Sequence, residues 1–261
     1  AMDIEEPKET ERLLPKESDS RHNEHPKTSG VSRARSWHDV PESEWANPAA
    51  DIRRGFLRKV YGLLTVQLLI TAAISLIFMF TEDIREWVLD HGWTLWLWFG
   101  ISIALIIGLS AVRHRHPLNI ILLLTFTVFE SLIIGTVCAA YYENGSGEAV
   151  GMAFVITMGV FFALTAFTFI SKIDFGFMGQ FLAAGLFILF FWGLVNLIFG
   201  WHLTFLYSAL GAVLFSLYIV YDTWQIANRL GCDDYIIASI ELYLDIVNLF
   251  LFILSMLGRR N

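Results

Sequence analysis

The sequence predicts an all-α polytopic membrane protein whose membrane domain is a bundle of seven helices. Of its 261 residues, 56% are hydrophobic and 15% aromatic, and the mean hydropathy is +0.57, well above the balance of a water-soluble domain. The apolar residues gather in runs of about 20, the length that crosses a bilayer as a helix with its backbone hydrogen bonds satisfied internally. The connections between the runs are short, so any chemistry must lie inside the bundle.

Seven apolar runs are long enough to span, and each is bounded by charged residues, glycine or proline. They cover residues 60–80, 93–112, 118–142, 149–170, 179–199, 203–221 and 236–257. We therefore expect a membrane domain over residues 51–261.

Residues 1–50 differ in composition, because they are rich in Glu, Lys, Ser and Pro and poor in apolar residues. This composition predicts a disordered tail, and the lack of a signal-peptide pattern predicts that it stays in the cytosol. Glu9 stands four residues before Leu13 and Leu14, the acidic dileucine spacing that sorting adaptors bind in proteins sent to vacuoles or lysosomes. The same spacing also arises by chance in polar tails.

Basic residues near the span ends indicate the orientation, because short cytosolic loops are enriched in Lys and Arg. If every span crosses, one side of the membrane receives Arg53, Arg54, Arg58, Lys59, Arg113, Arg115, Lys172 and Arg229, and Arg85 lies opposite. This pattern predicts a cytosolic N-terminus. Arg259 and Arg260 conflict with it if the seventh span crosses fully, but not if that segment is re-entrant or shallow, and the sequence leaves both options open.

Several kinds of chemistry are disfavoured by the residues present. All seven histidines lie in the tail or the loops, so no three can converge on zinc inside the bundle. Cys138 and Cys232 are expected to be free thiols rather than a disulfide framework. No phosphate-binding Gly-rich loop is present, which favours a passive leak over a pump.

The last span carries a stripe of polar residues in an otherwise apolar helix. Residues three and four apart share a helical face, so Glu241, Asp245, Asn248 and Ser255 lie on one side. We expect this side to face the inside of the bundle. Acidic groups at membrane depth are costly and are usually functional or paired, although a purely structural hydrogen bond is the alternative for each.

Two further acidic residues lie within other spans. Asp222 closes the sixth run, in which Ser208, Ala212 and Ser216 form a track of small residues that predicts close approach of a neighbouring helix. Glu130 stands alone in the third run, and its candidacy rests on the cost of its burial.

The C-terminal motifs are similar to those of a known family. FSLYIVYDTWQI, followed after an acidic loop by ASIELYLDIVNLFLFILSMLGR, resembles the signature of the Bax inhibitor motif family, especially its Lifeguard branch. HPLNIILLL and FTFISKIDFGFMG resemble that branch too. The resemblance covers residues 50–261, everything except the tail.

The resemblance implies a fold and an activity. It implies seven helices with the last enclosed by the other six, and a pH-sensitive calcium leak in internal membranes that restrains cell death. The family's aspartate pair corresponds to Asp222 and Asp245, and Arg113 or Arg115 is the candidate for a basic residue that locks the closed state. The family resemblance implies a location in the endoplasmic reticulum, whereas the dileucine spacing favours the Golgi and the vacuole.

Elementary electrostatics supports such a switch independently of the resemblance. Two carboxylates in a low-dielectric bundle cannot both ionise cheaply, so Asp222 and Asp245 are expected to share a proton and to titrate as a pair. Their oxygens also suit calcium, a hard cation, in transient passage rather than tight storage. Glu130, Glu241 and Asn248 are further candidates for the ion pathway.

The expected partners are calcium ions, protons and the lipid bilayer, with cell-death regulators and sorting adaptors as candidate proteins. No nucleic-acid partner and no tightly bound cofactor is expected.

Two other functions remain open from the sequence. Intramembrane aspartyl proteases also use paired aspartates on neighbouring spans. In those proteases the second aspartate lies in a GxGD motif followed by a PAL sequence, whereas here Asp245 lies in LYLD and no PAL sequence follows. We therefore expect no enzyme. A non-conducting scaffold that binds cell-death regulators is the other alternative, with aspartates that are only structural.

Overall fold

The computed structural model describes residues 48–112, 115–199, 204–231 and 233–258, and regular secondary structure in this part of the chain is helical. The elements are α1 (Pro48–Phe80), α2 (Glu82–Asp90), α3 (Trp93–Val112), α4 (Leu118–Glu143), α5 (Gly147–Ile170), α6 (Met178–Phe199), α7 (Thr204–Asn228) and α8 (Tyr235–Leu257). Within the described residues, seven of these helices are long and apolar enough to cross a membrane. The predicted all-α, seven-helix fold is therefore confirmed, and the chain is a multi-pass membrane protein.

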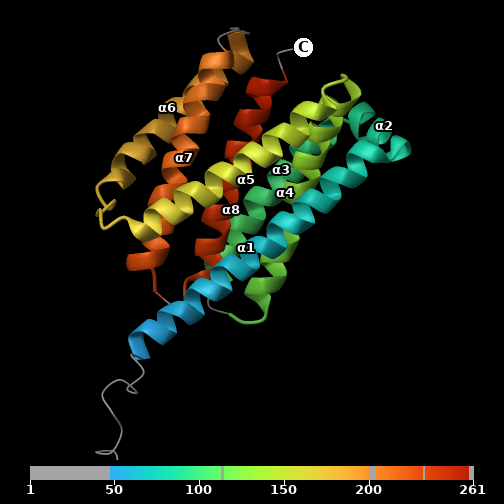
Figure 1. The fold of residues 1–261 in the computed structure, drawn as a ribbon. Helices are drawn as coiled ribbons and strands as arrows, with labels where there is room; N and C mark the ends of the chain where they lie inside the picture. Colours follow the sequence, from blue (N-terminus) through green and yellow to red (C-terminus); the bar gives the residue numbers. More distant parts are fainter. Residues whose placement is uncertain (1–47, 113–114, 200–203, 232, 259–261) are drawn as a thin grey trace, which may run out of the picture. The chain divides into compact units, whose positions relative to one another are not determined.

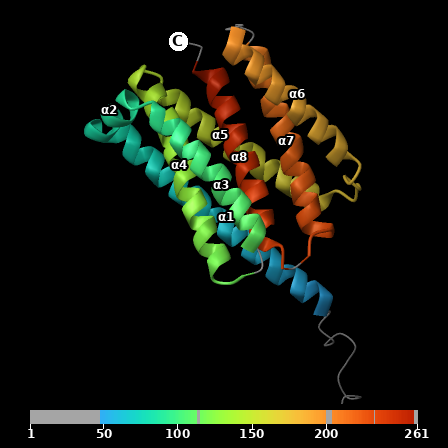
Figure 2. The same ribbon diagram turned by 180° about the vertical axis from the view of Figure 1, so that it is seen from behind.

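The last helix, α8, forms the centre of this bundle. It packs against α7, α5, α1 and α4, while α3 packs mainly on α4 and α6 mainly on α7. Figures 1 and 2 show α8 between these neighbours from both sides. Of the most apolar stretch of α8, 61% is buried, against 11% for α3 and for α6. Four helices thus contact the last helix extensively, and α3 and α6 lie outside them.

The seventh span is one continuous helix of 23 residues. Its C-terminal end lies at the opposite end of the bundle from the start of α1 (Figure 1). We call the end where α1 stops and α2 lies the α2 end, and the end where α7 passes into α8 the loop end. This helix is long and apolar enough to cross a membrane fully.

Two helical boundaries differ most from the sequence-based prediction. The first span begins at Pro48 rather than at residue 60, and the sixth span, α7, continues to Asn228 rather than stopping at residue 221. Hydropathy detects only the lipid-embedded part of a helix, so the charged and polar turns beyond it were missed. The connection after the first span also forms a helix, α2, in which Arg85 pairs with Glu143 of α4 at 2.6 Å.

Candidate functional site

Asp222 and Asp245 meet at the interface of α7 and α8. Asp222 lies six residues before the end of α7, whereas Asp245 lies near the middle of α8. Both side chains are buried, with 6% and 5% of their surface exposed, and the two carboxyl groups lie close enough to interact with each other. An ionised carboxylate has no donor, so the two groups can bond to each other only when one of them carries a proton.

Few other groups satisfy the pair. Nε2 of Gln225 donates a long hydrogen bond of 3.4 Å to Oδ1 of Asp222, and Oδ2 of Asp245 has no partner of ordinary geometry among the described residues. Tyr218 lies near enough to interact electrostatically with both carboxyl groups. Because so little else stabilises negative charge here, the two carboxyl groups would repel each other strongly if both were ionised.

Acidic side chains continue from this pair toward the loop end. The half-buried Glu241 lies one turn before Asp245 and interacts with the charges of Asp222 and Asp234. Asp245 in turn interacts with the charges of Asp222 and Glu241. Asp234 is the N-cap residue of α8. These four residues form an acidic row that leads from the loop end toward the middle of the bundle.

The rest of the polar stripe of α8 continues from the pair toward the α2 end. Asn248 donates to the carbonyl of Leu244 in its own helix at 2.8 Å. Near the α2 end, the hydroxyls of Ser255 and Ser208 lie 2.9 Å apart across the α7–α8 interface. The polar stripe of α8 therefore faces α7 at this end of the bundle as well.

A glycine beside the predicted small-residue track on α7 faces α8. A Cβ on Gly211 would lie 2.5–2.6 Å from ring atoms of Phe252. Gly211 thus permits the close approach of α8, and the partly buried Ala212 also packs against the core.

Glu130 lies apart from the aspartate pair. It is half-buried on α4, where it interacts with Ser102 of α3, and its charge reaches Tyr243. The Ser102 hydroxyl has no hydrogen-bond partner of ordinary geometry among the described residues. Glu130 is not among the charges that act on Asp222 or Asp245, so the structure does not bring it into the acidic row.

A second polar cluster, which the sequence analysis missed, links α8 to α1 and α4. The hydroxyl of Thr71 lies 2.9 Å from the hydroxyls of Ser131 and Tyr243, and Gln67 donates to Thr127 at 3.1 Å. The signal was present in the sequence, because Gln67, Thr71 and Ser75 recur every four residues on one face of the first span.

The gate lock proposed for Arg113 or Arg115 stays a prediction. Arg115 is exposed, and Arg113 lies outside the described residues. A different arginine, Arg53 of α1, bonds to the end of α7, since it donates to the carbonyl oxygens of Ala227 and Leu230 at 2.9 and 2.6 Å. The proposed sorting residues Glu9, Leu13 and Leu14 also lie outside the described residues, as does most of the predicted tail.

The coordination offered to a metal ion is sparse. Within the described part of the chain, no three His, Cys, Asp or Glu side chains gather as a metal site. Calcium takes six to eight oxygen ligands, so at Asp222 and Asp245 it would keep most of its water. Such a site suits passage rather than storage.

Comparisons with known proteins agree with this architecture. Residues 53–261 match the family model described as "Inhibitor of apoptosis-promoting Bax1". The chain is similar to mouse protein lifeguard 4, with 40% identity over 83% of this chain and 90% of the relative. It is also similar to the Golgi anti-apoptotic protein of vaccinia virus strain Lister, with 39% identity over 84% and 91%. Bax inhibitor 1 of Schizosaccharomyces pombe is 37% identical over 85% and 88%. The chain belongs to the Bax inhibitor motif family, to which the Lifeguard proteins also belong.

Proposed function

We propose that this protein is a pH-sensitive calcium leak channel of intracellular membranes, gated by the Asp222–Asp245 pair. The observation that carries the proposal is the burial of these two interacting carboxyl groups side by side at the α7–α8 interface. Protonation or deprotonation of the pair changes the electrostatic force between α7 and α8. The spacing of the two helices, and with it the width of the proposed ion path, therefore depends on pH.

The acidic row supports calcium as the permeating ion. Asp234 and Glu241 lead from the loop end to the pair, and negative side chains along an entrance raise the local concentration of cations. The pair supplies two carboxyl groups at most, too few to hold calcium tightly. An ion can therefore leave as readily as it enters.

The cellular role that we propose follows the names of the relatives. A Bax inhibitor 1 and a Golgi anti-apoptotic protein are among them, so we infer that this chain restrains cell death, in Golgi, endoplasmic reticulum or vacuole membranes with its N-terminus in the cytosol. Cell-death regulators and sorting adaptors are the proposed protein partners. A non-conducting scaffold that binds such regulators is the competing function.

Calcium flux into liposomes that contain the purified protein, measured over a pH series, tests the proposal. We expect wild-type flux to vary with pH and the flux of Asp222→Asn and of Asp245→Asn to lose that variation. Glu86→Gln, at an exposed position on α2, is the control and should behave as wild type. Absence of flux in the wild type favours the scaffold, and cleavage of a membrane peptide that either Asn variant abolishes favours the protease.

A further inference from the structure

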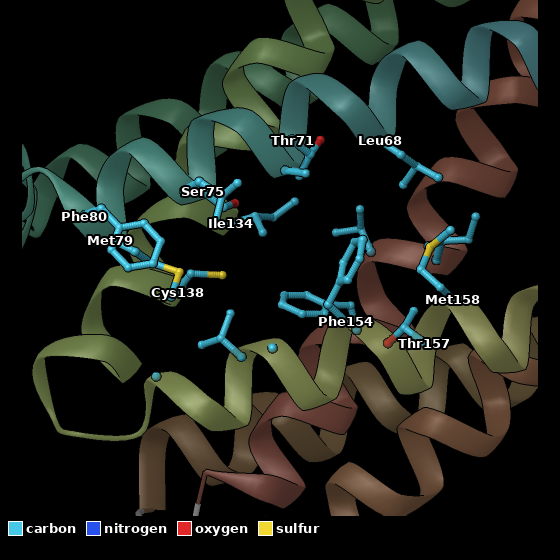
Figure 3. A pocket seen from close by; sticks show the side chains of 18 residues that line it. Leu68, Thr71, Ser75, Met79, Phe80, Ile134, Cys138, Phe154, Thr157 and Met158 are labelled. Carbon is cyan, nitrogen blue, oxygen red and sulfur yellow. The ribbon is translucent and has the colours of Figure 1, made fainter.

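A groove opens in the side of the bundle between α1 and α5, away from the aspartate pair. Its volume is about 360 Å³, and its floor is formed by Ile134 and Cys138 of α4 and by Ile246, Val247 and Phe250 of α8. Figure 3 shows the two rims facing each other across the space, with Leu68, Ser75 and Met79 on one side and Phe154, Thr157 and Met158 on the other. The groove is thus built by four of the membrane-spanning helices.

Aromatic contacts close the groove at its two ends. Near the loop end, the rings of Tyr61 on α1 and Phe169 on α5 lie 6.3 Å apart. Near the α2 end, the rings of Phe80 and Tyr142 lie 5.5 Å apart. Between these contacts α1 and α5 pack on α4 and α8 far more than on each other, which leaves the groove open toward the side.

The walls of the groove offer almost nothing to a polar ligand. No charged residue is among its described lining residues. The hydroxyls of Thr71 and Thr157 donate to carbonyl oxygens of their own helices at 2.9 and 2.7 Å. Ser75 lies beside the thiol of Cys138, and its buried hydroxyl is the one lining hydroxyl that has no hydrogen-bond partner among the described residues. A polar molecule would lose its hydrogen bonds to water without replacement, so the groove suits hydrocarbon.

The position of the groove indicates which hydrocarbon covers it. Its rim side chains Leu76 and Phe154 are about half exposed, on helices that span the membrane. The lining residues of α1 run from Leu68 to Phe80, a helical length of roughly 18 Å at about 1.5 Å per residue. Half the hydrocarbon core of a bilayer is about 15 Å. The groove therefore matches one leaflet, that of the α2 end.

The volume of the groove fits a single hydrocarbon chain. An apolar cavity of about 150 Å³ holds a benzene molecule, so a cavity of this size holds roughly a dozen carbon atoms. A helix of a partner protein is about 10 Å wide and would need roughly 1,400 Å³ over the same length.

We propose that this groove is a binding site for one acyl chain of a membrane lipid from the leaflet at the α2 end. The methyl end of the chain lies against Leu68 and Met158, and its middle contacts Ile246 and Val247 of α8. These two residues directly follow Asp245 in the sequence. A bound acyl chain therefore fills the gap between α1 and α5 and supports the helix that carries one half of the aspartate pair.

A photoreactive phospholipid with a diazirine near the methyl end of one acyl chain tests the site in vesicles that contain the protein. We expect mass spectrometry to find labelled peptides from residues 68–80 and 147–158 in excess of peptides from the lipid-exposed α6. Gly151→Phe should lower this labelling at least fivefold, because Gly151 lines the groove and a side chain there meets open space. Gly159→Phe is the matched control, since Gly159 is equally open on the same helix but outside the groove.

A second pair of variants, on α1, tests the site independently in case Gly151→Phe disrupts folding. Ala72 lines the groove and Ala73 does not, so Ala72→Phe should lose the label and Ala73→Phe should keep it. Competition by excess free oleate would identify a free fatty acid as the source of the chain, and lack of competition would identify a phospholipid; both outcomes retain an acyl-chain site. Equal labelling of all four variants and the wild type, or labelling by a sterol probe alone, would overturn the proposal.

Discussion

Arg53 on α1 donates a hydrogen bond of 2.9 Å from Nε to the carbonyl oxygen of Ala227 near the end of α7. Its Nη1 donates a second, of 2.6 Å, to Leu230. Carbonyl groups at a helix C-terminus lack partners within the helix and attract cations. Arg53 thus holds the end of the helix that carries Asp222 against the first span.

Loss of this contact should destabilise the protein. We expect Arg53→Ala to lower the free energy of unfolding by about 2–3 kcal/mol, because hydrogen bonds to charged groups contribute about 1.5–3 kcal/mol each. Arg53→Lys should recover only part of the loss, since an ammonium group cannot donate in two fixed directions. Thermal unfolding in detergent, followed by tryptophan fluorescence, measures the effect.

Arg54 supplies the matched control for Arg53. It is well exposed and forms a 3.5 Å pair with Asp51, and such exposed pairs contribute little. Equal melting temperatures for Arg53→Ala and Arg54→Ala would show that the contact with α7 is not stabilising.

Glu241 should tune the pH response without creating it. It interacts with Asp222 and Asp245, and a neighbouring negative charge disfavours ionisation of a carboxyl group. We expect Glu241→Gln to keep a pH-dependent calcium flux whose midpoint moves to lower pH. Liposome flux at closely spaced pH values measures the midpoint, with Glu148→Gln, on the first turn of α5, as the control. A flat profile would place Glu241 within the titrating pair itself.

The sequence predicted the spans and pointed to buried acidic residues because both depend on local signals. Runs of about 20 apolar residues identify a spanning helix directly, and acidic residues stand out within them. The facing of Asp222 and Asp245 followed from family resemblance rather than from spacing, since no local rule tells which two helices pack together.

The features that the sequence did not predict depend on tertiary contacts. Arg53 was counted only as a topology marker, because its bond to Ala227 joins residues far apart in the chain. Gly211 was not singled out beside Ala212, since the ring of Phe252 that decides the contact belongs to another helix. The polar face of α1 was periodic, but Gln67, Thr71 and Ser75 are weakly polar beside the acidic residues and were read as part of an apolar run.

Tyr243 should stabilise the bundle through its hydroxyl. Tyr243 is fully buried on α8, and its hydroxyl lies 2.9 Å from the hydroxyl of Thr71 on α1. The Thr71 hydroxyl also contacts the hydroxyl of Ser131. Tyr243→Phe keeps the ring and should cost about 1 kcal/mol, the typical contribution of one buried hydrogen bond. Thermal unfolding measures the loss. Tyr243→Phe in a Thr71→Val background should cost clearly less, and an undiminished cost there would show that the contact with Thr71 contributes nothing.

Close packing at Gly211 should control the distance between the two helices that carry the aspartates. A Cβ at Gly211 would lie 2.5–2.6 Å from the ring of Phe252, well inside van der Waals contact, so Gly211→Ala must push α8 away or turn the ring. Overpacking of this kind costs about 1–3 kcal/mol. Gly159→Ala, where a Cβ meets open space, should instead be neutral or stabilise the helix by up to about 1 kcal/mol.

The same substitution should alter calcium flux if the α7–α8 interface is the gate. Asp222 and Asp245 lie on the same two helices as Gly211 and Phe252, so a wedge at Gly211 should move the two carboxyl groups apart and reduce the dependence of flux on pH. Phe252→Leu added to Gly211→Ala removes the ring and should restore both the melting temperature and the pH profile toward wild type. Recovery of stability with a pH profile that remains altered would show that the gate does not depend on the spacing of α7 and α8 at this level.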